Sequence, residues 1–388
     1  MTLQRNSTAT NFRNSLSLWE RARVRASCRG CRRSPLPSPL SSPRGRGSKN
    51  SRSSVLLTLL ALLIALIVAR PATAAVAAAK IRLSQSNVGV SAAPLWFAVR
   101  NGLFRKHGIE VEPIYVRNST IQMLALTTGE VQLSHTSGVP TLSAAASGHD
   151  LKIVATFNHD VYWDIVSRPE LKSMDDLRGK EIGVTNIGGT TWIGAILGLE
   201  SFKLNPERDR IKLQALGDQT VLSQALTSGR IDAILTEPSF TRELRKKGFN
   251  VLAELSRAKI PFASSGLVLS RNYLQQQPEI VEAVLRGLIE ATAFVYNPAN
   301  QEAVLRFFTE RLKLSDIAAA KEALQDLDRT LARNPYPGLD GLRNIQRVLR
   351  YNPSVAKIKA EDLIDERIYR KLADSGFIDS VYKFAKSK

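Results

Sequence analysis

The sequence predicts an α/β protein with two similar lobes, each built on a mostly parallel sheet flanked by helices, with a hinge and a cleft between them. Its 388 residues are enough for two domains of ordinary size. One short pattern also occurs twice, as ALTTGEVQL at 125–133 and as ALTSGRIDA at 225–233. In each copy an apolar helix ends at a glycine, the residue that favours a left-handed C-cap, and an apolar strand follows. Such a repeat indicates two lobes of one design.

The repeat extends to the segments around this pattern, at the same offset. Strands are expected at 81–86 and 111–116, matching 182–186 and 211–216, and helices at 93–104 and 119–128, matching 193–204 and 219–228. Alternating strands and helices are typical of a parallel sheet with helices on both faces.

After the second copy the chain is expected to return to the first lobe. GLVLSRNYL at 266–274 predicts a strand that rejoins the first sheet, and helices are expected at 278–297, 302–312, 315–332 and 361–376. We therefore assign 80–180 and 261–388 to the first lobe and 181–260 to the second. Two crossings between the lobes predict a hinge.

The start of the chain has the features of a targeting segment. VLLTLLALLIALIV at 55–68 is apolar but shorter than the roughly 17–20 residues that span a bilayer. Basic residues precede it, and Ala72-Thr73-Ala74 follows it. This order predicts a signal peptide over 55–74 that is cleaved after Ala74, with Ala79 as the second choice, and hence a periplasmic protein.

Residues 1–54 are expected to be a basic disordered leader, or to lie upstream of the true translation start. Residues 1–74 carry 13 basic residues and one acidic residue, so 75–388 keep only +7 of the net charge of +19. A strong nucleic-acid partner is therefore not indicated. Both cysteines, Cys28 and Cys31, lie in the leader. The mature chain then has no thiol chemistry, and histidine spacing indicates no metal site and no cofactor.

Four loops should line the cleft, because open parallel sheets bind ligands at the carboxyl ends of their strands. They are 87–94 and 135–140 in the first lobe, and 186–192 and 236–240 in the second. The candidate binding residues in these loops are Ser91, Ala92, Thr136, Ser137, Gly189, Thr190, Thr191, Trp192 and Glu237.

The glycine-rich stretch NIGGTTW at 186–192 is the most suggestive of these loops. Gly189 and Gly194 have the spacing of a phosphate loop, but Ala195 and Ile196 stand where Lys and Ser/Thr are needed, and the dinucleotide pattern is absent. A helix N-terminus with Thr190 and Thr191 could instead hold a carboxylate, sulfonate or phosphate group. The alternative is that the glycines only turn the chain and Thr190 only caps the helix.

The four segments 93–112, 125–138, 177–192 and 225–240 together resemble the solute-binding proteins of ABC importers for nitrate, taurine and alkanesulfonates. The resemblance implies a type II periplasmic binding fold that closes on one small solute, which is expected to be anionic. It also implies delivery to a membrane permease and its ATPase. Pyrimidine, flavin and aromatic binders occur in the same family. We expect a monomer that is not an enzyme, with no catalytic residues.

Two alternatives stay open. The same fold resembles thiamine-pyrimidine synthases, which use an active-site histidine and a cysteine cluster. A periplasmic sensor subunit that binds a solute for a separate signalling partner is the other. Whether Trp163 and His159 reach the pocket is not apparent from the sequence.

Overall fold

The computed structural model describes residues 79–86, 89–116 and 118–386. The predicted leader, the hydrophobic segment at 55–68 and the cleavage site after Ala74 lie outside these residues. Within the described ranges, no helix has the length and apolar character needed to cross a bilayer.

In the described part of the chain, ten strands form two five-stranded sheets with the same strand order. The first sheet runs β2 (Ile109–Tyr115), β1 (Ala79–Gln85), β3 (Leu133–Thr136), β10 (Pro261–Ser270) and β4 (Leu151–Asp160). The second runs β7 (Lys212–Ala215), β6 (Glu181–Val184), β8 (Ala233–Thr236), β5 (Asp164–Ser167) and β9 (Asn250–Glu254). Within the described residues, β10 and β5 run opposite to the other four strands of their sheets, which all point the same way. The prediction of two similar, mostly parallel sheets is therefore confirmed.

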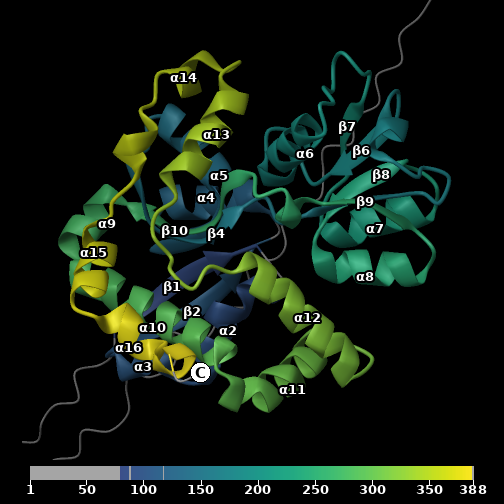
Figure 1. Ribbon diagram of the computed structural model, residues 1–388. Helices are drawn as coiled ribbons and strands as arrows, with labels where there is room; N and C mark the ends of the chain where they lie inside the picture. Colours follow the sequence, from purple (N-terminus) through teal and green to yellow (C-terminus); the bar gives the residue numbers. More distant parts are fainter. Residues whose placement is uncertain (1–78, 87–88, 117, 387–388) are drawn as a thin grey trace, which may run out of the picture. The chain divides into compact units, whose positions relative to one another are not determined.

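Each sheet is the centre of a lobe. The helices of the first lobe's repeat are α2 (Ala93–Arg100), α3 (Leu103–Lys106), α4 (Ser119–Thr127) and α5 (Gly138–Ala146). Those of the second lobe are α6 (Thr190–Ser201), α7 (Gln219–Thr227) and α8 (Pro238–Lys246). Figure 1 shows α7 and α8 on the same side of the second sheet; α7 contacts β8, and α8 contacts β5 and β9. Gly102, at φ +65°, ends the helix predicted at 93–104 early and begins α3.

The C-terminal helices pack mainly on the first lobe. They are α9 (Arg271–Gln276), α10 (Pro278–Tyr296), α11 (Gln301–Arg311), α12 (Ile317–Thr330), α13 (Leu339–Leu349), α14 (Pro353–Ala356), α15 (Arg367–Asp374) and α16 (Phe377–Val381). Helix α10 contacts α2, α3 and β2, as Figure 1 shows, and α13 contacts β10 and α5. The helix predicted at 361–376 is shorter, because α15 begins only at Arg367.

The chain passes to the second sheet earlier than the sequence indicates. β5, at Asp164–Ser167, already pairs with β8 and β9, so the predicted boundary at residue 180 is wrong. The strand was missed because a four-residue strand that runs against its neighbours has no counterpart in the βα repeat. The two crossing segments pair with each other: Val161 N donates to Ile260 O at 2.9 Å, and Leu255 N donates to Trp163 O at 3.1 Å.

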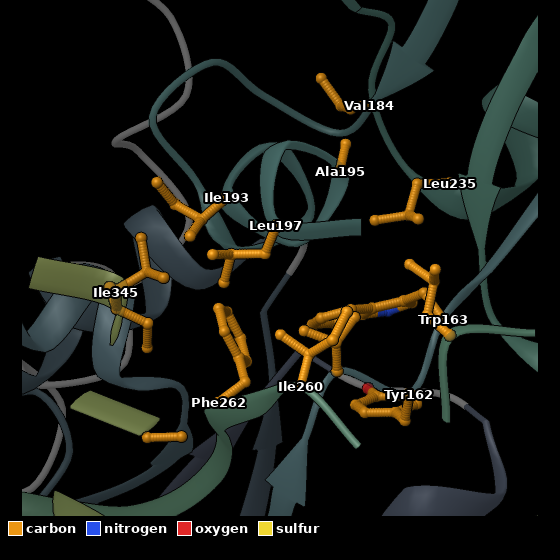
Figure 2. Packing of buried hydrophobic residues seen from close by; sticks show 14 of the residues in the cluster. Tyr162, Trp163, Val184, Ile193, Ala195, Leu197, Leu235, Ile260, Phe262 and Ile345 are labelled. Atoms are coloured by element: carbon orange, nitrogen blue, oxygen red, sulfur yellow. The ribbon is translucent and has the colours of Figure 1, made fainter. Parts of the chain in front are cut away.

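A continuous apolar core accompanies these crossings. Figure 2 shows Trp163 and Phe262 beside residues of α6 such as Ile193 and Leu197. The rings of Trp163 and Phe262 meet edge to face, with centroids 5.7 Å apart. The hinge segments are therefore anchored by packing as well as by backbone hydrogen bonds.

Candidate functional site

A cavity of about 350 Å³, which we call the cleft, is lined by residues of both lobes. The first lobe contributes Thr136 at the end of β3 and Ser137 after it, and the second contributes Thr190 and Glu237. The crossing segment contributes Trp163. A molecule bound here would therefore contact both lobes and the hinge at once.

Among the described residues, five helices begin at the cleft. They are α4, α5, α6, α7 and α8, whose first residues or N-caps line the cavity. The geometry follows from the topology, because each parallel strand ends at the edge of the sheet where the next helix starts. Helix N-termini carry partial positive charge and point unpaired amides outward, so the cleft suits groups that accept hydrogen bonds.

The helices differ in how their first turns are capped. The side chains of Asn118, Ser137 and Asp218 accept backbone N–H bonds at the starts of α4, α5 and α7. Gly189 gives α6 no side-chain cap. The first-turn amides of α6 are thus left for another acceptor, which keeps the predicted anion cradle at Thr190 and Thr191 as a hypothesis.

The two lobes are joined across the cleft by hydroxyl groups. Thr190 Oγ1 lies 2.7 Å from Ser137 Oγ and 3.3 Å from Ser119 Oγ. Asn186 Nδ2 donates to Thr120 Oγ1 at 3.3 Å. These contacts connect the start of α6 to the starts of α4 and α5.

Thr191 has a different role from its neighbour. Its Oγ1 accepts the backbone N–H of Thr185 at 3.0 Å and lies 2.7 Å from Thr185 Oγ1. This hydroxyl therefore ties the start of α6 to the end of β6. Of the two threonines, Thr190 is the one whose hydroxyl reaches across the cleft.

The cleft brings together five of the nine predicted residues: Thr136, Ser137, Thr190, Thr191 and Glu237. The other four, Ser91, Ala92, Gly189 and Trp192, are not among its lining residues.

Packing accounts for the four residues outside the cleft. Ser91 and Ala92 are buried in the turn before α2. A Cβ at Gly189 would collide with the Asn186 side chain, whereas the Trp192 ring meets Tyr351 edge to face at 6.1 Å.

The sequence did not show whether Trp163 and His159 reach the pocket. Trp163 does line the cleft, and Tyr162 beside it stacks on its ring at 4.4 Å. His159 is not a lining residue, and its ring stacks on Tyr336 at 4.1 Å.

Sequence reasoning missed the loops that lead into α4 and α7. Asn118 and Ser119 line the cleft in the first lobe, and Asp218 and Gln219 do so in the second. The repeat contained the signal, because the capping residues Asn118 and Asp218 stand at the same offset as the rest of the two copies.

Buried polar side chains fix the ends of these strands. Gln122 of α4 donates to Ser84 O at 2.9 Å and to His135 O at 2.7 Å, at the ends of β1 and β3. In the second lobe Thr236 Oγ1 donates to Gln219 Oε1 at 2.7 Å. A glutamine near the start of α4 in the first lobe, and another at the start of α7 in the second, thus hold the strand ends that face the cleft.

The cleft is polar but carries no lysine or arginine among the described residues that line it. Asp218 and Glu237 are its carboxylates. Burial lowers the pKa of His135 to about 4, so this ring is neutral at pH 7. The hydroxyl of Thr136 is buried and has no hydrogen-bond partner within the described part of the chain. A solute could supply the missing partner.

Asp164 of β5, near the hinge, is a buried carboxylate outside the lining of the cleft. Burial raises the pKa of Asp164 to about 7, against the opposing effect of the Thr241 hydroxyl, and Glu254 raises it further while Arg329 and Arg245 lower it. A raised folded-state pKa means that the native state holds the proton longer than the unfolded state does. Its stabilising contribution is present below about pH 4 and is lost as the pH rises through about 7.

We therefore expect Asp164→Asn to remove this pH dependence. The variant should gain melting temperature relative to the parent protein at pH 8, and should show little gain at pH 4. Thermal unfolding followed by circular dichroism across this range measures the difference. Glu207→Gln, an exposed change in the second lobe, is the control. Equal differences at both pH values would contradict the assignment.

The described residues contain no group of three or more His, Cys, Asp or Glu side chains placed to hold a metal ion. The lining of the cleft also includes no cysteine. What the cleft offers is hydroxyls, helix N-termini, aromatic rings and two carboxylates.

Two lobes of one strand order, with a polar cavity where their helices begin, define the class of two-lobed binding proteins with the type II periplasmic fold. The chain belongs to the NMT1/THI5 like family, whose model matches residues 90–301, more than half of its length. The resemblance seen in the sequence is thereby confirmed at the level of fold and family.

The chain is similar to known proteins in sequence and in fold. The riboflavin-binding protein RibY of Chloroflexus aurantiacus is 27% identical over 258 residues, which are 64% of this chain and 71% of RibY. Two solved structures share the fold at low identity. The periplasmic aliphatic sulphonate binding protein SsuA of Escherichia coli has a TM-score of 0.62 at 17% identity and covers 75% of this chain and 92% of its own. The periplasmic nitrate-binding protein NrtA of Synechocystis has a TM-score of 0.64 at 13% identity, with 77% and 89% covered.

Proposed function

We propose that this protein is the extracytoplasmic solute-binding component of an ABC importer. It captures a small organic solute in the cleft and delivers it to a membrane permease that works with an ATPase. We further propose that the protein is exported through the signal peptide at 55–74 and acts as a monomer. The observation that carries the proposal is a cavity lined by both lobes and by the hinge.

The proposed mechanism is closure of the two lobes on the solute. A ligand that contacts both lobes binds the closed state more tightly than the open one, and so shifts the population toward closure. The hydroxyl contacts between Thr190, Ser137 and Ser119 belong to that closed state. No bond in the solute is made or broken.

The size and chemistry of the cleft favour an organic solute over nitrate. A cavity of about 350 Å³ falls in the range used by drug-sized ligands and exceeds what a four-atom anion needs. Trp163, Tyr162 and Phe240 provide flat surfaces for a ring or an alkyl chain. An acidic group of the solute, such as a sulfonate or carboxylate, would lie at the start of α6.

The enzyme alternative has less support. A thiamine-pyrimidine-synthase-like activity would need a cysteine cluster near the cleft, and the lining residues described above supply none. A sensor subunit would use the same cleft. Transport and sensing are distinguished by whether solute uptake by membrane vesicles requires this protein together with its permease.

Thermal unfolding against a panel of solutes tests the binding function. Riboflavin, taurine, alkanesulfonates, aromatic sulfonates, carboxylates and nitrate are each added to the purified protein. A ligand present at about a hundred times its dissociation constant should stabilise the fold by about 2.7 kcal/mol. Failure of every panel member to raise the melting temperature would contradict the proposal.

Substitution of Thr190 is expected to affect solute binding, whereas substitution of Thr191 is expected to affect stability. Thr190→Val is expected to weaken solute binding about fivefold, because a cleft hydroxyl worth about 1 kcal/mol is lost. Thr191→Val should instead lower the free energy of unfolding by about 1 kcal/mol, because Thr185 N loses its acceptor. Calorimetric titration and denaturant unfolding measure the two effects. Equal effects of both changes on affinity would contradict the distinction.

A further inference from the structure

Glu237 is a carboxylate in the cleft whose side chain has no partner in the described part of the chain. It lies between the end of β8 and the start of α8 and is partly buried. Its backbone oxygen accepts the Thr241 hydroxyl at 3.2 Å, but its side chain makes no hydrogen bond or ion pair with any described residue. A buried carboxylate in this state carries a desolvation cost that nothing in the lining offsets.

Asp218, the other carboxylate of the cleft, differs from Glu237 because its side chain is hydrogen-bonded. Asp218 accepts the backbone N–H groups of Thr220 and Val221, at 3.0 and 3.1 Å, and so caps its own helix. Glu237 stands at the same N-cap position of α8 but makes no such bond, and Pro238 removes the first amide of that helix. Capping therefore explains Asp218 and does not explain Glu237.

The described residues that line the cleft offer Glu237 no lysine or arginine. The titratable groups that share the cleft with it are His135 on β3, Asp218 at the start of α7, Tyr115 at the end of β2 and Tyr162 in the hinge. His135 is neutral and Asp218 is already bound to amides. A bound solute that presents a positive charge or an N–H group would satisfy Glu237.

We infer that Glu237 is the specificity-determining residue of the cleft, and that it selects organic solutes that present an N–H donor, either an amine or a ring N–H. The inference rests on the proposed binding function and adds the chemical class of the solute to it. The rings of Phe240 and Trp163 in the same lining suit the carbon skeleton that carries such a nitrogen. Solutes that only accept hydrogen bonds leave the carboxylate unsatisfied and bind more weakly.

Protonation gives this selection a pH dependence. Burial raises the pKa of Glu237 to about 7, so the group is partly protonated at neutral pH. A donor or ammonium group favours the carboxylate form. Donor solutes should therefore bind more tightly at pH 8 than at pH 6, with proton release on binding in this range.

Three pairs of probes, matched except for the donor, test the inference. They are riboflavin with 3-methylriboflavin, taurine with ethanesulfonate, and 4-aminobenzenesulfonate with benzenesulfonate. Calorimetric titration of the purified protein at pH 8 should show at least tenfold tighter binding of the donor member in each pair that binds. Glu237→Leu should abolish the preference. Glu237→Gln, which keeps an acceptor but no charge, should reduce it at least threefold and remove the pH dependence of binding.

Glu243→Gln is the matched control, because Glu243 lies on the same helix, is exposed and does not line the cleft. It should leave the preference unchanged. Equal binding within the pairs by the parent protein would overturn the inference while leaving the binding function intact. No binding by any of the six probes, together with no response to the wider panel, would overturn both. If Glu237→Leu does not fold, the glutamine variant decides.

Discussion

Replacing Gly341 with alanine is expected to lower the free energy of unfolding by about 3 kcal/mol. Gly341 lies on α13 where this helix crosses the start of β10. An added Cβ would lie 2.5 Å from the carbonyl carbon of Phe262 and collide with the backbone nitrogen of Ala263. These are backbone atoms of β10, which pairs with β4 at Pro261 and again from Ser265 and with β3 from Gly266, so they yield less readily than the end of a flexible side chain would.

Thermal and denaturant unfolding measure this effect, and we expect the melting temperature to fall by roughly 6–12 °C. Asp340→Ala is the control on the same helix. Its side chain is exposed, and the change should stay within about 0.5 kcal/mol. A Gly341→Ala protein as stable as the control would show that α13 does not approach β10 this closely.

Removal of the Asp326 carboxylate is expected to weaken solute binding about 30-fold, equivalent to about 2 kcal/mol. Asp326 of α12 forms an ion pair with Arg242 of α8, and both side chains are about one-tenth exposed. Helix α12 contacts β4 of the first lobe, while α8 follows β8 of the second. The pair therefore bridges the lobes, and its loss leaves Arg242 buried without its main partner in the closed state.

Calorimetric titration with the best solute of the panel measures the affinity of Asp326→Ala, and small-angle scattering of the ligand-free protein measures opening. Arg242→Ala and the double variant complete a cycle, whose coupling energy isolates the pair. Arg347 and Glu200, 2.5 Å apart, form an exposed pair between α13 and α6. Glu200→Ala should cost less than about 1 kcal/mol. Equal effects of Glu200→Ala and Asp326→Ala would contradict a dominant role for the buried pair.

The fold could be predicted from the sequence where the same local pattern occurs in both lobes. Gly129 and Gly229 both adopt positive φ, +80° and +74°, after equivalent helices, so the C-cap pattern located corresponding points in the two lobes. Helix α13 was missed although Leu342, Ile345 and Leu349 follow helical spacing. What the sequence does not reveal is where this helix packs, which depends on the close approach of Gly341 to β10. β5 was missed for a similar reason, since its partners β8 and β9 lie far along the chain.

The candidate site was predictable to the level of loops but only partly to the level of residues. Topology places the strand ends at the cleft, and this placed Thr136, Thr190 and Glu237 correctly among its lining. Which side chain of a loop faces the cavity depends on the turn that follows. Trp192, two residues after Thr190, points to Tyr351 instead. Strand order predicts which loops line the cleft, whereas the tertiary structure is needed to tell which of their side chains face it.

The central position of β10 also constrains how the protein is assembled. β3 and β4 are joined only through β10, a segment more than 100 residues further along the chain than β4 begins. During synthesis, the first sheet therefore stays open at this point until residues 261–270 have been made. Long-range pairings of this kind form slowly, and the unpaired edges of β3 and β4 could meanwhile associate with other chains. The second lobe contains all five of its strands between Asp164 and Glu254 and so can fold before the first.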